Sequence, residues 1–343
     1  MGLNDAGFTI AEGLVRRCAE LGAAVAVCGG VVVLDCGVNA AGSDEAGLGM
    51  ARVALGGAGD VAITPASSTA ASSTPASSTH AAGPAPWPGC PWPTVSVTSD
   101  HPVAACLAAQ YAGWKVSSGR YFAMASGPIR AAIGREKLFD AIGLRETPAV
   151  AVGLLETGTL PPAEICHDLA AAAGVAPERL ILLVARTASR AGTLQVVARS
   201  LETALHKLHD GGFDLGRIRR GTGTAPLPPV PADDLVAIGR TNDAILYGGS
   251  VRLEVTGDDD SLAEIGPRSV SRSSPAFGEP FLAVFERAGR DFYAIDPALF
   301  APAQLEFVNV ETGRRHVFGT TEPAILSGSF DTRAATDRAP AGR

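Results

Sequence analysis

The spacing of apolar and polar residues predicts helices in some segments and strands in others, and the two kinds of segment interleave over most of the chain. Within residues 10–21 the apolar positions fall three and four apart, which predicts one face of a helix. The β-branched runs at 31–35 and 95–97 are bounded by Gly, Pro or Ser, as buried strands commonly are. Further strands are predicted at 149–155, 180–184, 244–255, 281–286 and 304–310. The pattern therefore predicts a mixed α/β (α+β) fold of layered helices and sheets.

One stretch interrupts this alternation. Residues 65–79 repeat the small polar units PASST, AASST and PASST, and a segment rich in Pro and Gly with Trp87 and Trp92 follows. Such a composition cannot bury enough apolar surface to offset the entropy of ordering. We predict a flexible surface insertion at 64–93, within a single unit spanning 1–328. The tail at 329–343 has no periodic apolar face, so we expect it to be frayed.

The composition excludes several classes of function. The 343 residues are 46% hydrophobic, which is enough for a sizeable core. A formal net charge of −7 is a poor match for a nucleic-acid backbone. Apolar runs fall far short of the ~20 residues that span a bilayer, and no secretory signal is visible. The six cysteines lack any metal-ligand spacing. We expect a cytoplasmic protein with reduced thiols that binds neither nucleic acid nor membrane.

Familiar nucleotide and hydrolase motifs are broken or missing. The segment 47–52 begins like a dinucleotide fingerprint, but it ends in Arg52, where a small residue would let the helix pack on its strand. The sequence contains no GxxxxGK[ST], HExxH or GxSxG motif. A nucleotide-dependent oxidoreductase is therefore disfavoured. The glycines at 56–57, 221–223 and 248–249 mark either tight turns or close approaches of the backbone to a ligand.

The most informative segment is 192–209. Its apolar residues keep the spacing of a buried helical stripe, and the other face carries polar residues at steps of four and three: Gln195, Arg199, Glu202, His206 and His209. Facing water alone, Arg199 and Glu202 would form an i,i+3 pair contributing about 0.2–0.5 kcal/mol. Facing a cleft, a carboxylate, a cation and amide or imidazole groups would converge on a substrate. The spacing alone leaves both interpretations open.

The residues of this segment, TLQVVARSLETALHK from Thr193, closely resemble the central signature of the methenyltetrahydromethanopterin cyclohydrolases. Four further stretches resemble the same family in the same order: VLDCGVNAAGSDEAG from Val33, AACLAAQYAGW from Ala104, ASGPIRA from Ala125 and GRTNDAILYGG from Gly239. Together they extend over about residues 10–318.

This resemblance implies two layered α/β lobes with the substrate in the cleft between them, commonly assembled as a homotrimer. It implies reversible hydrolytic ring opening of N5,N10-methenyltetrahydromethanopterin to N5-formyltetrahydromethanopterin. In bacteria that reaction usually serves formaldehyde oxidation within one-carbon metabolism. The chemistry requires no redox cofactor and no metal, and the pterin derivative is the substrate. A pterin-binding carrier without turnover remains the alternative.

The resemblance also places Glu202 at the reaction centre, where we expect it to act as general base toward the attacking water. Arg199 is expected either to tune and orient Glu202 or to hold the water and the developing oxygen. Six further polar residues in matching stretches either contact the pterin or its acidic tail, or are structural hydrogen-bonders: Gln110, Arg130, Gln195, Arg240, Asn242 and Asp243. His206 and His209 either line the cleft or pack elsewhere.

Overall fold

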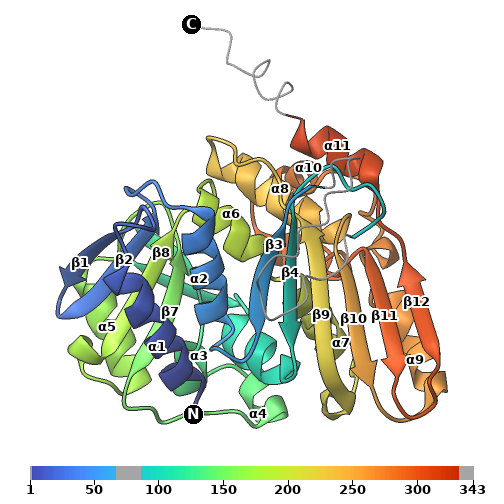
Figure 1. The fold of residues 1–343 in the computed structure, drawn as a ribbon, viewed down its shortest axis with the longest axis horizontal. Helices are drawn as coiled ribbons and strands as arrows, with labels where there is room; N and C mark the ends of the chain where they lie inside the picture. Colours follow the sequence, from blue (N-terminus) through green and yellow to red (C-terminus); the bar gives the residue numbers. More distant parts are fainter. Residues whose placement is uncertain (1, 67–85, 332–343) are drawn as a thin grey trace, which may run out of the picture.

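Two six-stranded sheets stand side by side, and helices cover both (Figure 1). The structure is a computed structural model that describes residues 2–66 and 86–331. The first sheet has the order β1 (Ala24–Cys28), β2 (Val31–Gly37), β8 (Leu180–Ala185), β7 (Ala151–Glu156), β6 (Tyr121–Ser126) and β5 (Trp114–Ser118). The second has the order β12 (Arg315–Gly319), β11 (Gln304–Asn309), β10 (Ser250–Val255), β9 (Ile218–Pro226), β4 (Thr94–Ser99) and β3 (Asp60–Thr64). The predicted mixed α/β fold with two lobes is confirmed.

The first sheet is buried on both faces at its centre. Strand β8 pairs in parallel with β2 and β7, and all of its residues are buried. Helices α1 (Leu3–Arg16) and α2 (Asp44–Ala54) cover one face, and α3 (Ile129–Ile133) and α5 (Ala163–Ala173) cover the other. Because both faces are covered, these strands consist of nearly continuous apolar residues, which is why the sequence predicted them well.

The second lobe packs its helices on a mainly antiparallel sheet. Helix α7 (Ser200–Asp210) lies against β9, β10 and β4, while α8 (Asp234–Leu246), α10 (Phe281–Arg287) and α11 (Pro323–Phe330) form a group at the upper end in Figure 1. Two further short helices are α9 (Asp259–Ile265) and α4 (Leu138–Ile142). No helix within the described residues is long and apolar enough to cross a bilayer.

The segment predicted as one long helix at 192–209 is two helices. Helix α6 (Arg190–Val197) ends at Ala198, and α7 begins at Ser200 after Arg199. The amide Nε2 of Gln110 donates to the carbonyl oxygen of Ala198 at 3.0 Å, which satisfies a carbonyl freed by the break. Gln110 is the last residue of a π-helix, η1 (Val103–Gln110), and π-helices are rare and frequent at functional sites. The break places Glu202 in the first turn of α7.

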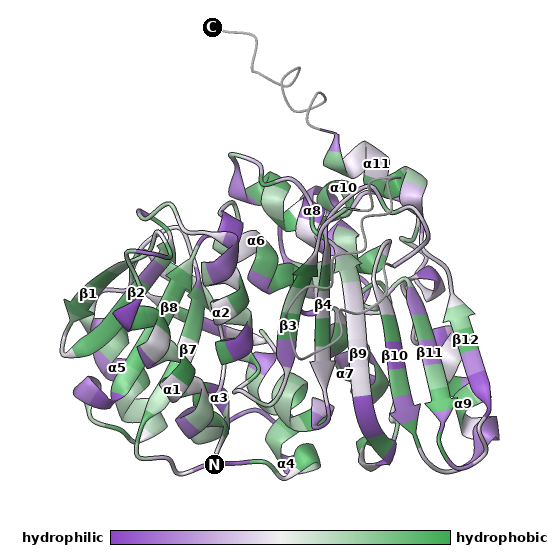
Figure 2. Ribbon diagram, in the orientation of Figure 1, coloured by the Kyte–Doolittle hydropathy of each residue, from purple (hydrophilic) through white to green (hydrophobic). Residues whose placement is uncertain are grey.

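Two glycines of β9 let α7 approach the sheet closely. A Cβ atom at Gly223 would lie 2.7 Å from the backbone nitrogen of Leu201, and one at Gly221 would lie 2.7 Å from the Leu201 Cδ1 atom. Strand β9 is accordingly paler than β10 in the hydropathy view (Figure 2). The prediction of a turn at 221–223 is wrong, because these glycines lie within a strand and the close approach is to a helix.

Three other predictions are corrected by the structure. The apolar run 281–286 is helix α10, not a strand, since its buried residues Phe281, Val284 and Phe285 are spaced three and one apart on one helical face. The predicted strand 244–255 is the end of α8 followed by β10, with Gly248 and Gly249 between them. The first helix spans Leu3–Arg16 and not 10–21.

The predicted insertion connects β3 and β4, which pair antiparallel. Its described end is packed, because Cys90 is buried and the Trp92 ring lies 4.9 Å from the ring of Phe330 in α11. Phe330 is itself buried and is the last residue of α11. The ordered helix therefore extends slightly beyond 329, where the tail was predicted to begin. The remainder of the insertion, 67–85, and of the tail, 332–343, lies outside the described residues.

We expect Gly223→Ala to lower the free energy of unfolding by about 1–3 kcal/mol, because the added methyl group would push against the backbone at the start of α7. Denaturant unfolding measures this change. The matched control is Gly13→Ala in α1, where a Cβ atom meets nothing closer than 3.9 Å and a gain of about 0.5–1 kcal/mol is expected. Equal stability of the Gly223→Ala variant and the unmodified protein would contradict the close approach.

Candidate active site

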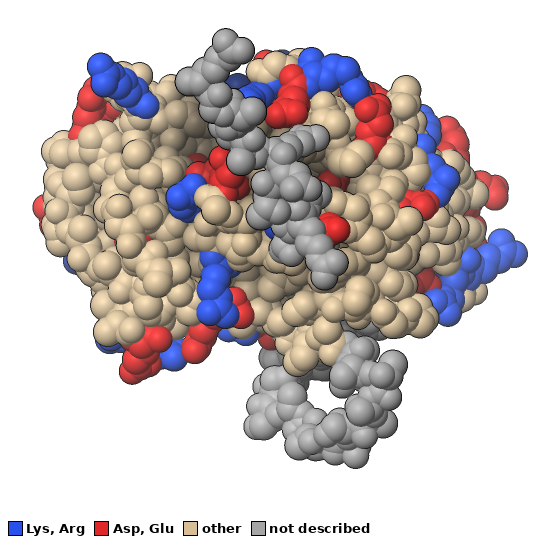
Figure 3. All heavy atoms as spheres, turned by 90° about the horizontal axis from the view of Figure 1, so that it is seen from above, with Lys and Arg blue, Asp and Glu red and all other residues tan. Residues whose placement is uncertain are grey.

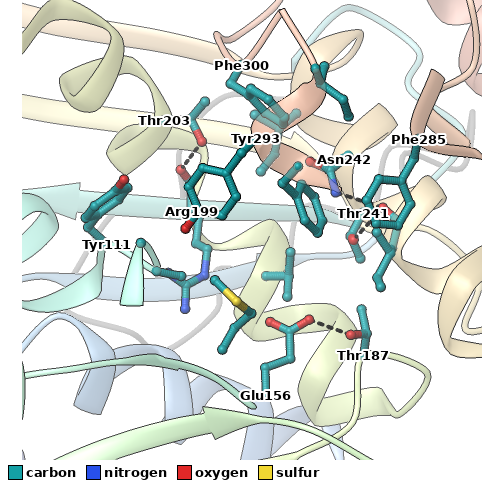
Figure 4. A pocket seen from close by; sticks show the side chains of 18 of the residues that line it. Tyr111, Glu156, Thr187, Arg199, Thr203, Thr241, Asn242, Phe285, Tyr293 and Phe300 are labelled. Carbon is teal, nitrogen blue, oxygen red and sulfur yellow. Dashed lines mark hydrogen bonds between the residues drawn. The ribbon is translucent and has the colours of Figure 1, made fainter. Parts of the chain in front are cut away.

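A cavity of about 660 Å³ lies between the two lobes, within the size range of small-molecule sites (Figure 4). The first lobe contributes Lys115 of β5, Phe122 and Met124 of β6, and Glu156 of β7. The second contributes Glu202, Thr203 and His206 of α7, Ile238 and Asn242 of α8, Phe285 of α10, and Phe292, Tyr293 and Phe300 of the segment that follows. The cavity therefore combines aromatic walls with charged and polar side chains.

Glu202 is the buried acid of this cavity. Its side chain is only 6% exposed, and its carboxyl group has no hydrogen-bond partner among the described residues. Burial raises the pKa of Glu202 to about 7, although the cations Arg199 and Arg130 act in the opposite direction. A carboxyl group with this pKa and no partner can accept a proton from water and return it near neutral pH.

Arg199 is a fixed cation on the floor of the cavity. Its guanidinium donates to the backbone oxygen of Gln110, to Ser126 Oγ at 3.0 Å and to Gln195 Oε1 at 3.1 Å. Burial lowers the pKa of Arg199, while the nearby carboxylates of Glu202 and Glu156 raise it. These three acceptors come from three separate segments, so the orientation of the guanidinium depends on the packing of both lobes.

A second carboxylate, Glu156, lines the cavity and was missed by the sequence analysis. It is the last residue of β7, and Thr187, which follows the neighbouring parallel strand β8, donates to it at 2.5 Å. Gln195 Nε2 also donates to Glu156, at 3.3 Å. Ligands of α/β proteins commonly bind beyond the carboxyl ends of parallel strands. The place of Glu156 directly after the predicted strand 149–155 was therefore the sequence signal that could have identified it.

Tyr111 and His206 form one wall. Their rings stack with centroids 4.3 Å apart and planes 19° apart. The guanidinium of Arg130 lies 4.9 Å from the centre of the Tyr111 ring. Burial lowers the pKa of His206, so its imidazole is neutral at pH 7 and can support an apolar face.

Several predicted residues support the site from outside the cavity. Arg130 is fully buried, pairs with Glu136 at 2.8 Å and donates to the backbone oxygen of Leu107, so it anchors the π-helix to α3. Gln110 caps the break after α6. Gln195 links Arg199 to Glu156 and does not itself line the cavity.

Arg240 and Asp243 are on the side of α8 that faces the C-terminal segment. Arg240 donates to the backbone oxygens of Pro229, Ser329 and Asp331. Asp243 accepts from the backbone N–H of Phe281 and from the Ser329 hydroxyl, and burial raises its pKa to about 7. Neither lines the cavity, whereas Asn242 does, with its amide donating to the Ile238 oxygen at 2.9 Å. His209 is also absent from the lining.

The face of the molecule seen from above carries no basic patch that would suit a polyanion. On the face shown in Figure 3, Lys and Arg side chains are interspersed with Asp and Glu. Within the described part of the chain, no group of three His, Cys, Asp or Glu side chains is arranged to hold a metal ion.

An unpartnered acid beside a cation, in a cavity with aromatic walls, is the kind of arrangement that can move a proton on a bound molecule. The comparisons with known proteins agree with this chemistry. The chain belongs to the family described as Cyclohydrolase (MCH), whose sequence model matches residues 2–330.

Named relatives are similar over nearly the whole chain. A methenyltetrahydromethanopterin cyclohydrolase of Methylobacillus flagellatus is 40% identical over 301 residues, covering 88% of this chain and 86% of the relative. One of Rhodopirellula baltica is 41% identical over 307 residues, covering 88% and 86%. One of the archaeon Methanococcoides burtonii is 34% identical over 303 residues, covering 88% and 89%.

The burial of Glu202 predicts a pH-dependent cost to folding. Its pKa of about 7 in the folded chain exceeds the ordinary 4.5, so the folded state loses stability relative to the unfolded state as pH rises from about 4.5 to about 7. Removing the charge in Glu202→Gln removes this loss. We expect the stability of the variant relative to the unmodified protein to increase by about 2–3 kcal/mol over that range.

Denaturant unfolding at pH 4.5, 6 and 8 measures the difference. Glu164→Gln is the matched control, because Glu164 is an exposed residue in the first turn of α5. A stability difference that is the same at all three pH values would contradict a buried acid at position 202.

Proposed function

We propose that this chain catalyses the reversible hydrolysis of N5,N10-methenyltetrahydromethanopterin to N5-formyltetrahydromethanopterin in one-carbon metabolism, where it serves formaldehyde oxidation. The observation that carries the proposal is the unpartnered, buried carboxyl group of Glu202 beside Arg199 on the floor of an aromatic cavity. The names of the relatives supply the substrate.

The reaction needs one proton acceptor. The methenyl carbon lies between two nitrogens in a cationic amidinium and is already electrophilic. As the water oxygen bonds to this carbon, Glu202 takes a proton from the water, and the hydrated ring is then neutral. The proton passes from Glu202 to N10 as the bond between that nitrogen and the carbon breaks. The hydroxyl group on the carbon gives its own proton to Glu202 as the C=O bond forms, which leaves the formyl group on N5, and Glu202 then releases this proton to solvent. Overall, the cation and water give the formyl product and one proton. Positioned proton transfer of this kind is worth ~10²–10⁴ in rate.

Arg199 tunes and orients Glu202 in this proposal. Burial alone would push the pKa of Glu202 up, and the positive charge of Arg199 opposes this more strongly than that of Arg130. Because the guanidinium is fixed by Gln110, Ser126 and Gln195, its distance from Glu202 does not depend on bound substrate. The base therefore remains partly ionised at neutral pH.

The finer features of the proposal come from the family resemblance. We propose that the protein acts in the cytoplasm as a homotrimer and uses neither a redox cofactor nor a metal, because the amidinium is activated by its own charge. Sedimentation velocity at micromolar concentration measures the subunit count.

The first test is turnover. Purified protein mixed with methenyltetrahydromethanopterin is expected to bleach the near-ultraviolet absorbance of the substrate far faster than buffer does, and Glu202→Gln is expected to lose a factor of ~10²–10⁴ in kcat. The control Glu164→Gln should match the unmodified protein. A non-catalytic carrier would instead bind the substrate equally well with and without Glu202→Gln and show negligible turnover in both.

The pH profile provides an independent prediction. Hydrolysis needs ionised Glu202, so its kcat should fall as pH decreases through about 7. Replacing Arg199 with Met removes the cation that lowers the pKa of Glu202, and the inflection should therefore move to higher pH. The control Arg179→Met changes an exposed arginine just before β8. An unmoved inflection in Arg199→Met would contradict the tuning role.

A further inference from the structure

Glu156 is a cavity-lining carboxylate that the mechanism above does not use. It ends β7 in the first lobe, in register with Met124 of β6 and Ala185 of β8. Its position is set by the sheet rather than by a loop, and its carboxyl group points to the Thr187 hydroxyl in Figure 4.

Two side chains donate hydrogen bonds to the carboxyl group of Glu156. Thr187 Oγ1 donates to one oxygen at 2.5 Å and Gln195 Nε2 donates to the other at 3.3 Å. The Gln195 amide is held at both ends, since its oxygen accepts from Arg199 at 3.1 Å. Among the described residues, no Lys or Arg forms a direct ion pair with Glu156, so its carboxyl group is available to a cationic ligand.

The other charged residues of the lining are at its mouth. Lys115, Asp210, Arg290 and Asp291 are exposed, and Asp234 is half-buried and paired with Arg186 at 3.0 Å. Solvent and salt screen charges in such positions. The interior charges of the lining are therefore those of Arg199, Glu202 and Glu156.

We propose that Glu156 is the counter-ion of the cationic amidinium of the substrate, so that the site distinguishes the cationic methenyl form from neutral forms of the carrier. This inference rests on the proposed function. With Glu156 and Glu202 ionised and Arg199 positive, the empty interior carries one negative charge, and the substrate cation neutralises it.

Neutrality then persists through the reaction. When the water proton moves to Glu202, the hydrated ring is neutral, and Arg199 and Glu156 balance each other. Without Glu156 the interior would carry one uncompensated positive charge before and after the proton transfer. An unpaired charge in a desolvated site is costly, so the cationic substrate would be the species most affected by the loss.

The test compares a cationic and a neutral ligand. Dissociation constants for methenyltetrahydromethanopterin and for tetrahydromethanopterin, which lacks the one-carbon unit and is neutral at this position, are measured in the Glu202→Gln background so that turnover does not consume the ligand. Adding Glu156→Gln is expected to weaken binding of the methenyl form roughly 10- to 100-fold and binding of the neutral form less than about 3-fold.

Matched variants separate charge from structure. Glu156→Asp keeps the charge and should retain most of the discrimination between the two ligands. Thr187→Val removes a hydrogen-bond donor but leaves the carboxylate of Glu156, so this variant should retain the discrimination as well. Glu156→Ser, which removes the charge with a smaller side chain, should reproduce the loss seen with Glu156→Gln and serves as the readout if that variant does not fold.

The outcomes are distinct. If Glu156→Gln weakens the binding of both ligands equally, Glu156 only holds Gln195 and Arg199 in place. This result would overturn the inference and leave the proposed function intact. Failure of the Glu202→Gln protein to bind either ligand, together with no turnover by the unmodified protein, would overturn the proposed function and this inference with it.

Discussion

The break between α6 and α7 determines the geometry of the whole site. A continuous helix would carry Arg199 and Glu202 along one stripe, whereas the turn at Ala198 and Arg199 places the acid in the first turn of a new helix. At the break, Gln110 donates to the carbonyl oxygen of Ala198, and glycines in β9 let α7 approach the sheet closely. The position of Glu202 thus depends on contacts between α7 and other elements, and local helix propensity has little part in it.

The electrostatics of the site result from two opposing effects, of which burial is the larger. Burial favours protonated Glu202, and the fixed cation of Arg199 favours ionised Glu202, so the acid is balanced near neutral pH. Arg199 could not be held in so dry a place without acceptors, and it obtains them from Gln110, Ser126 and Gln195. The polar groups beneath the cavity therefore act by keeping one guanidinium in place, which accounts for their burial.

The sequence predicted the elements whose pattern is local and missed those set by tertiary structure. The buried parallel strands are apolar throughout, so they were found, whereas the run at 281–286 is too short for its period to separate a strand from helix α10. The break after Ala198 involves neither Gly nor Pro, and its cause is 88 residues away at Gln110.

The candidate site was predicted in part for the same reason. Arg199 and Glu202 came from a long match to a family and line the cavity, as does Asn242. Arg240 and Asp243 come from an equally good match, but they face the C-terminal segment, because resemblance does not tell which side of a helix is turned to a ligand. Glu156 ends a predicted strand, but its closeness to Thr187 became evident only once β7 and β8 were known to pair in parallel.

The path of the chain has a consequence for synthesis on the ribosome. The first sheet uses strands between Ala24 and Ala185, but β3 and β4 of the second sheet are made in the middle of that stretch. The second sheet is completed only by β12, and Arg240 finds its acceptors in the last helix and just beyond it. Neither lobe is a continuous piece of chain, so the cavity closes only when translation is almost finished. Until then, the strand edges of the unfinished second sheet are exposed to other chains.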